Sequence, residues 1–310
     1  MDLVYLIFGI LILLFSGDML VRAAVDISLK MAISPMIVGL TVIAFGTSAP
    51  ELLVGLQATW NGYGGLALGN IIGSNITNTL VILGMPALII AIKSTDIGLI
   101  RNYYFMLAAT FLFIVFLFFD AVTFWKGTLL LLLLILFILQ AIVFNEKSSQ
   151  NFNASDLEQD RKLMGVFRLV GFLSMGFVGL PVGAHIVISS ATRFATSIGV
   201  SNEIIGLTVV AIGTSLPELA TSMAAAYRRE VNLLLGNVIG SNMFNILGIA
   251  GAAALISPLR LTDKIEFMPL AALFLSSLML APFILLRKPI SRSVGMMFLS
   301  VYILYTVSSF

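Results

Sequence analysis

The hexapeptide Gly46-Thr47-Ser48-Ala49-Pro50-Glu51 interrupts an apolar run from Ile37 to Leu56, and it returns as Gly213-Thr214-Ser215-Leu216-Pro217-Glu218. The offset of 167 residues holds without a gap from 37–84 to 204–251, with 25 identities in 48 aligned positions. We call two residues that are 167 positions apart repeat mates. Because an internal repeat marks the structural unit of a chain, these two copies predict a fold of two related halves with polar residues at equivalent places.

The composition is that of an integral membrane protein. Hydrophobic residues make up 59% of the 310 residues, charged residues 10%, and the mean hydropathy is +1.08. A soluble domain has about 25% charged residues. The absence of cysteine excludes disulfides and thiolate metal sites, and the single histidine excludes an imidazole cluster. A net charge of +2 gives no indication of a nucleic-acid partner.

A spanning helix needs about 20 apolar residues, and the hydropathy pattern predicts ten such segments. They are approximately 3–29, 35–58, 66–92, 103–119, 126–144, 163–192, 203–226, 233–256, 267–286 and 294–307. The predicted units are a first five-helix repeat (1–144), a cytoplasmic linker (145–162) and a second five-helix repeat (163–310). An odd number of spans per repeat places the two copies in opposite orientations, as in many secondary transporters.

The first segment is expected to be a span, because Asp2 stands where a signal peptide has its basic residues and no A-x-A cleavage site follows. With the N-terminus outside, 13 Lys and Arg residues fall on the cytoplasmic side and four on the outer side. The positive-inside rule therefore predicts that both termini face outward from a cell (inner or plasma) membrane.

Glu51 and Glu218 are expected near the middle of the membrane, where a carboxylate costs about 2.5–3.5 kcal/mol even on the lenient insertion scale. No Lys or Arg lies within a turn or two of either residue. A buried structural carboxyl is the alternative, but it would have to occur twice with the same neighbours. The pattern favours a mobile cation as the partner of both carboxylates.

The residues before each glutamate support this interpretation. Thr47 and Ser48 lie four and three residues before Glu51 and share its helical face, as Thr214 and Ser215 do with Glu218. Pro50 and Pro217 lack an N–H and clash with the carbonyl four residues back. This predicts freed carbonyls near Ala44 and Gly46, and near Ala211 and Gly213. A plain proline kink would explain the prolines and glycines, but not the hydroxyls and the acid.

The following segment repeats as well, as Gly69-Asn70-Ile71-Ile72-Gly73-Ser74-Asn75-Ile76-Thr77-Asn78 and Gly236-Asn237-Val238-Ile239-Gly240-Ser241-Asn242-Met243-Phe244-Asn245. Ser74 with Asn78, and Ser241 with Asn245, share a helical face and are interpreted as ion contacts. The other amides (Asn70, Asn75, Asn237 and Asn242) fit ion contact and interhelical packing equally well.

These segments together offer carboxylates, hydroxyls, amides and carbonyls, all of them hard oxygen donors. Ca²⁺ takes six to eight such oxygens at about 2.3–2.6 Å, and Na⁺ accepts the same donors. Two carboxylates balance one Ca²⁺ or two Na⁺, so either ion neutralises the site. Exchange follows, because the empty site leaves two charges in a medium of low dielectric constant.

At this point the two motifs resemble the alpha-repeats of the cation/calcium exchanger superfamily, Na⁺/Ca²⁺ exchanger type, in a minimal prokaryotic ten-helix form with the signature G-T-S-x-P-E. The resemblance implies an all-α membrane protein with broken helices 2, 3, 7 and 8 around a central ion site, and no cofactor beyond the transported ions. It implies that Ca²⁺ and Na⁺ are bound by Glu51, Glu218, Thr47, Ser48, Thr214, Ser215, Ser74, Ser241, Asn78 and Asn245, with the carbonyls of Ala44 and Ala211. It also implies that the first and sixth helices slide as a pair across the remaining bundle.

The predicted function is a secondary antiporter that exchanges Na⁺ for Ca²⁺ by alternating access, electrogenic and independent of K⁺. H⁺-coupled or K⁺-dependent Ca²⁺ exchange and a cation channel are the alternatives. An enzyme is not expected, since neither motif holds a histidine, cysteine or lysine base. The bilayer and the two ions are the expected partners, with no obligatory protein partner.

Two features outside the repeats stand apart from this assignment. Asp18, Arg22 and Asp26 are spaced by four residues and can pair along one face of the first helix. His185 is the repeat mate of Asp18. A proton-sensing role for this histidine is weighed against a packing or interfacial role, which the sequence favours.

Overall fold

The computed structural model describes residues 2–94, 96–143, 163–198, 211–261 and 267–308. The predicted linker 145–162 and the first part of the seventh span, 203–210, lie outside the described residues. Within the described ranges the secondary structure is helical, as predicted, and no strand is present beyond two isolated bridges that join Ile92 to Ile290 and Val122 to Leu259.

The first half of the chain begins with a long helix and a broken one. Its elements are α1 (Asp2–Met31), α2 (Pro35–Val38), the π-helix η1 (Gly39–Ile43), α3 (Ala44–Thr47), α4 (Ala49–Trp60), α5 (Gly64–Ile89), α6 (Leu99–Phe119) and α7 (Phe124–Val143). These match the five predicted spans to within a few residues.

The second half repeats this order of elements. They are α10 (Val166–Ser197), α12 (Ala211–Thr214), α13 (Leu216–Tyr227), α14 (Val231–Met243), the π-helix η3 (Phe244–Ile249), α15 (Ala250–Ile256), α16 (Phe267–Met279), α17 (Ala281–Leu285) and α18 (Arg292–Ser308). Seven helices of the described chain are long and apolar enough to cross a membrane, or eight when the bent pair Pro35–Thr47 and Ala49–Trp60 counts as one span. The remaining two predicted spans correspond to α12–α13, which is described only in part, and to the shorter α18.

The interruptions of the helices agree with the prediction in the second and seventh spans only. The second bends by 46° between Thr47 and Ala49, and the seventh is divided at Ser215, between α12 and α13. The break expected in the third span is wrong, because α5 runs unbroken from Gly64 to Ile89. The eighth continues from α14 through η3 into α15 as one span. No proline stands beside the polar residues of either span. The third span keeps its α-helical hydrogen bonds, and the eighth changes to the π-helical pattern at Phe244–Ile249 without a break in the span.

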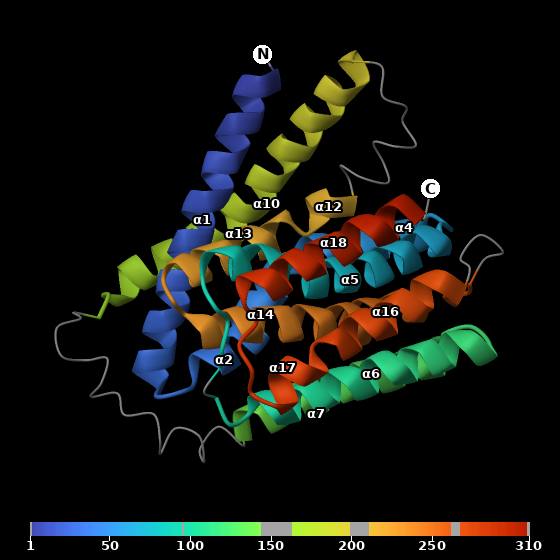
Figure 1. Ribbon diagram of the computed structural model, residues 1–310. Helices are drawn as coiled ribbons and strands as arrows, with labels where there is room; N and C mark the ends of the chain where they lie inside the picture. Colours follow the sequence, from blue (N-terminus) through green and yellow to red (C-terminus); the bar gives the residue numbers. More distant parts are fainter. Residues whose placement is uncertain (1, 95, 144–162, 199–210, 262–266, 309–310) are drawn as a thin grey trace.

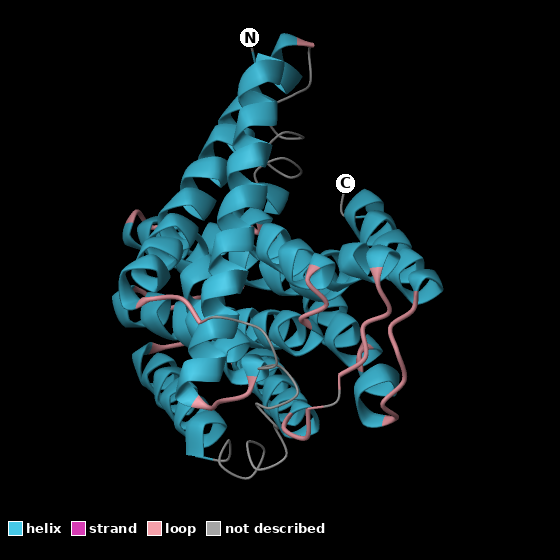
Figure 2. Ribbon diagram, turned by 90° about the vertical axis from the view of Figure 1, so that its left-hand side faces the viewer, coloured by secondary structure: helices cyan, strands magenta, loops and turns pink. Residues whose placement is uncertain are grey.

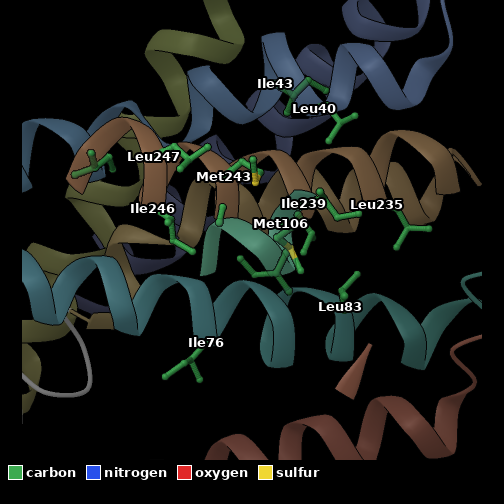
Figure 3. Close-up of a cluster of buried hydrophobic side chains, with 14 of the residues drawn as sticks. Leu40, Ile43, Ile76, Leu83, Met106, Leu235, Ile239, Met243, Ile246 and Leu247 are labelled. Atoms are coloured by element: carbon green, nitrogen blue, oxygen red, sulfur yellow. The ribbon is translucent and has the colours of Figure 1, made fainter. Parts of the chain in front are cut away.

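The helix α14 forms the centre of the bundle. Figure 3 shows Leu40 and Ile43 of η1 on one side of it and Ile76 and Leu83 of α5 on the other, all of them buried. Gly236 of α14 allows this close approach, since a Cβ there would lie 2.3 Å from the carbonyl oxygen of Met36. Close packing of this kind is what glycines provide between membrane helices.

The helices α1 and α10 lie side by side and form a pair. They cross the other helices steeply and extend beyond them at one end (Figures 1 and 2). The bundle therefore consists of a long helix pair and a packed core that carries both repeated motifs.

Candidate ion-binding site

The first motif is positioned by the break in the second span. Ser48 has φ −83° and ψ 4° and links α3 to α4, and Pro50 stands in the first turn of α4, where its missing N–H is no loss. Glu51 follows in the same turn, and the positive end of the helix dipole favours a carboxylate there. The mate segment has the same geometry, with Glu218 in the first turn of α13 after Ser215.

The two carboxylates face each other across the repeats. Glu51 and Glu218 are each 1% exposed and lie close enough to interact electrostatically. The Ser48 hydroxyl donates to Glu218 Oε1 at 3.0 Å, so a hydroxyl of the first repeat binds the acid of the second. Its mate Ser215 lies within interaction range of Glu51 but makes no hydrogen bond of normal geometry. The ion pairs found among the described residues include neither glutamate.

The helix α5 carries Ser74 and Asn78, α14 carries Ser241, and η3 carries Asn245. Ser74, Asn78, Ser241 and Asn245 are all buried. Asn245 Nδ2 donates to Ser74 Oγ at 2.8 Å, which links α14 and η3 to α5. The mate contact is not formed, because Asn78 and Ser241 make no side-chain hydrogen bond.

Several buried polar atoms of this region have no hydrogen-bond partner. They are Oε2 of Glu51 and of Glu218, Oγ of Ser215 and of Ser241, both amide atoms of Asn78, and Oδ1 of Asn245. A buried unpaired polar atom costs about 1–3 kcal/mol, so these atoms are candidates for contact with a bound ligand. All but one are oxygens, which are the donors that Ca²⁺ requires. The described residues contain no group of three or more His, Cys, Asp or Glu side chains that could hold a metal ion.

The threonines and the carbonyls behave differently from the glutamates. Thr47 Oγ1 lies 3.4 Å from both Asn237 Oδ1 and the Ala44 carbonyl oxygen, and Thr214 is half-buried at the end of α12. The freed carbonyl expected at Ala44 is wrong, because it also accepts from the Ser48 N–H at 3.0 Å. The missing Pro50 N–H would have bonded to the carbonyl four residues back, that of Gly46, and not to Ala44. The Ala44 carbonyl therefore offers only its second lone pair to an ion. Ala211 opens α12.

Two of the remaining repeated amides, Asn70 and Asn242, join one helix to another. Asn75 Nδ2 donates to the Ile71 carbonyl oxygen of its own helix at 2.7 Å, Asn242 Nδ2 to Thr79 Oγ1 at 3.1 Å, and Asn70 Nδ2 to the Glu51 carbonyl oxygen at 3.5 Å. For Asn242 and Asn70 the structure therefore supports the packing alternative, whereas Asn75 bonds only within its own helix and its Oδ1 has no hydrogen-bond partner.

Asn237 reveals a residue that the sequence analysis missed. Its Nδ2 donates to Ser222 Oγ at 3.2 Å while its Oδ1 accepts from Thr47, so a chain of hydrogen bonds joins α13, α14 and α3. Ser222 is buried. The available signal was its spacing, four residues after Glu218 on the same helical face. Its repeat mate is Gly55, so the first repeat has no equivalent hydroxyl.

We expect Ser222→Ala to raise the Ca²⁺ concentration for half-maximal transport about fivefold, which corresponds to the loss of one hydrogen bond of about 1 kcal/mol. The reason is that Asn237 would no longer hold the Thr47 hydroxyl in place. The measurement is the concentration dependence of Ca²⁺ uptake into proteoliposomes. Thr221→Ala is the matched control, because Thr221 Oγ1 donates only to the Pro217 carbonyl oxygen of its own helix. An equal effect of both variants would show that Ser222 does not position the site.

Comparison with known proteins agrees with this geometry. The family model described as "Sodium/calcium exchanger protein" matches residues 1–143 and 168–310. The chain is 30% identical to the Sodium/calcium exchanger MaX1 of Methanosarcina acetivorans, over 98% of this chain and 97% of that one. It is 37% identical to the Inner membrane protein YrbG of Escherichia coli (strain K12), over 82% and 79%.

A solved structure is similar over nearly the whole length. The sodium-calcium exchanger NCX_Mj superposes with a TM-score of 0.85 at 31% sequence identity, covering 99% of this chain and 98% of the other. The similarity therefore includes both repeats and the helix pair α1–α10.

Proposed function

Because this chain belongs to the sodium/calcium exchanger protein family, we propose that it exchanges Na⁺ for Ca²⁺ at the site between Glu51 and Glu218. The observation that carries the proposal is the pairing of these two buried carboxylates, each with an oxygen that has no hydrogen-bond partner. Their charge of two balances one Ca²⁺ or two Na⁺. In the proposed mechanism the two cargoes replace each other at one place.

The donor set proposed for the ions extends from the carboxylates to neutral oxygens. It consists of Glu51, Glu218, Thr47, Ser48, Thr214, Ser215, Ser74, Ser241, Asn78 and Asn245, with the backbone carbonyls of Ala44 and Ala211. A neutral ligand contributes coordination without adding charge, so the site can fill the six to eight positions that Ca²⁺ requires and stay balanced. Support comes from the unpaired oxygens of Asn78, Asn245, Ser215 and Ser241.

The coupling follows from burial. An empty site would leave two carboxylates facing each other in a medium of low dielectric constant, and this state is expected to reorient poorly. The protein would therefore change its accessible side with Ca²⁺ or Na⁺ bound, which is the condition for antiport rather than leak. We place both termini outside on the charge bias of the loops, with inward Na⁺ flow driving Ca²⁺ out of the cell.

The test is uptake of radiolabelled Ca²⁺ into proteoliposomes under gradients of Na⁺, K⁺ and H⁺, each imposed alone. The proposal expects uptake driven by an outward Na⁺ gradient and abolished when Na⁺ is equal on both sides. Uptake that follows only the H⁺ gradient would instead support proton coupling. Large unitary currents in bilayer recordings would establish a channel.

We expect transport to proceed without K⁺. The repeat mates Asn78 and Asn245 are both amides, which donate an oxygen but no charge, so the site has no third carboxylate with which to attract a K⁺ beside Ca²⁺. The measurement is Na⁺-driven Ca²⁺ flux in vesicles in which choline replaces K⁺. Flux that vanishes there and returns with K⁺ would overturn the expectation. Asn245→Asp supplies a third acid and should admit a second cation with Ca²⁺.

A further inference from the structure

The pair formed by α1 and α10 is fastened along its whole length. At Gly9 and Gly183 a Cβ would lie 3.1 Å from the carbonyl oxygen of the other glycine, so the two backbones are in direct contact. At one end Arg193 Nε donates to Asp2 Oδ1 at 2.8 Å. At the other the Met164 N–H, just before α10, donates to Asp26 Oδ2 at 2.6 Å. The two helices are therefore held to each other at both ends and in the middle.

The helix α1 of this pair packs closely against α13 of the core. A Cβ at Gly17 of α1 would lie 2.9 Å from the Ala220 carbonyl oxygen of α13. The next residue, Asp18, accepts from Arg228 Nε at 2.5 Å, and Arg228 is the residue at which α13 ends. The second oxygen of Asp18 accepts from Arg22 Nε of its own helix at 2.9 Å. Thus one carboxylate receives a guanidinium from each of the two bodies.

We propose that Asp18 and Arg228 form an ionic latch, which holds the helix pair α1–α10 against α13 and closes the bundle at the C-terminal end of α13. The proposal rests on the alternating access of the proposed function, because the buried site can load and release ions only if the packing around it opens on each side in turn. Opening on the side of Arg228 requires the Asp18–Arg228 contact to break. The latch therefore sets how often this side is open.

Among the described residues, the repeat mates of Asp18 and Arg228 form no equivalent ion pair. The repeat mates of Asp18 and Arg228 are His185 and Asn61, both exposed, and neither forms a side-chain hydrogen bond or ion pair among those found in the described residues. Leu53, the mate of Ala220, is 68% exposed, whereas Ala220 is 6% exposed. The repeats carry the same ion-binding motifs, but the latch residues differ between them, so the two repeats would close unequally.

The position of the contact makes it more than a surface ion pair. Exposed pairs contribute little to stability, but the side chains of Asp18 and Arg228 are only 26% and 24% exposed and have complementary partners. Breaking one of two contacts to Asp18 is expected to change the open fraction about tenfold, equivalent to about 1.4 kcal/mol. The pair with Arg22 lies within α1 and links no second body, so its loss should leave that fraction unchanged.

The test uses the absence of native cysteine. Ala220→Cys places one thiol under the contact between α1 and α13, and Tyr227→Cys places one at the 83% exposed end of α13 as a reference. The rate of labelling by a polar maleimide is measured on the purified protein and divided by the rate at position 227. Arg228→Gln is expected to raise this ratio about tenfold, and the matched control Arg22→Gln to leave it unchanged. Equal ratios for the two variants would overturn the latch.

Folding is controlled by gel filtration, and a second variant keeps the test decisive. Arg228→Lys retains the charge but loses the guanidinium, so it should give a ratio between the parent and Arg228→Gln. If Arg228→Gln does not fold, Arg228→Lys compared with Arg22→Lys decides in the same way, and no difference between them contradicts the latch. Because labelling measures no transport, a failed latch and a failed exchange function are distinguishable.

Discussion

Replacing Glu51 or Glu218 by glutamine is expected to reduce Na⁺-driven Ca²⁺ transport more than 100-fold while the protein still folds. The amide keeps the shape of the side chain but removes one of the two charges that balance the ion. Removing one partner of a buried charge pair costs about 3 kcal/mol or more, and about 3 kcal/mol is already more than 100-fold in an equilibrium constant. Folding should survive, because the variant no longer buries two like charges beside each other.

The measurement is initial uptake of radiolabelled Ca²⁺ into proteoliposomes under an outward Na⁺ gradient, with reconstituted protein quantified. Asp120→Asn is the control, because Asp120 is an exposed acid at the end of α6, outside the candidate site. It should transport like the parent. Uptake near the parental rate in either glutamine variant would remove that carboxylate from the proposed ion site.

At equilibrium, the ratio of Ca²⁺ concentrations across the membrane is expected to change about fiftyfold for each 100 mV of membrane potential. Two Na⁺ satisfy Glu51 and Glu218, and the neutral oxygens around them can hold at least one more. With three Na⁺ for each Ca²⁺, one net charge crosses the field, at about 2.3 kcal/mol per 100 mV, which corresponds to about fiftyfold.

The potential is set with valinomycin and K⁺ in proteoliposomes that hold fixed Na⁺ gradients, and the final Ca²⁺ ratio is recorded. The Ca²⁺ ratio should follow the potential in the direction of net positive charge moving with Na⁺. A ratio that stays constant from zero to 100 mV would establish electroneutral exchange of two Na⁺ for one Ca²⁺.

The sequence predicted the features that follow from local chemistry and repetition. Pro50 and Pro217 each lack an N–H, so the breaks at Ser48 and Ser215 could be located to within a residue or two. The carboxylates could be recognised because an acid at mid-membrane is expensive and here occurs twice. Helical spacing also predicted that Ser74 shares a face with Asn78 and Ser241 with Asn245, and all four side chains are buried.

What the sequence did not predict depends on contacts between elements far apart in the chain. Ser222 accepts from Asn237 across two helices, and Asn237 in turn accepts from Thr47, but the spacing of these residues along the chain shows neither contact. The i,i+4 pair of Asp18 with Arg22 was predicted and is confirmed, whereas the partner of Asp26 is the Met164 N–H. The contact of Asp18 with Arg228 joins two helices, so the spacing of residues along α1 could not predict it. The internal repeat gives no signal for this contact either, because the repeat mates of Asp18 and Arg228 are His185 and Asn61.

The inequality of the two repeats was equally hidden. Asn78 and Asn245 have identical local sequence positions, yet only Asn245 donates to a serine of the opposite helix. Identical residues supply the same atoms in both repeats. In a single conformation of the protein, however, the two repeats have different surroundings, so these residues make different contacts.

The central claim, that Ca²⁺ and Na⁺ occupy one site in turn, is tested most directly by equilibrium binding. Radiolabelled Ca²⁺ bound to the purified protein is measured as Na⁺ is raised at constant ionic strength with choline. The account predicts that bound Ca²⁺ falls to zero, with a dependence on Na⁺ steeper than a single competing ion gives, and that Glu51→Gln and Glu218→Gln bind no Ca²⁺ at the same concentration. Ca²⁺ that remains bound at saturating Na⁺ would contradict it, because the two ions would then have separate sites.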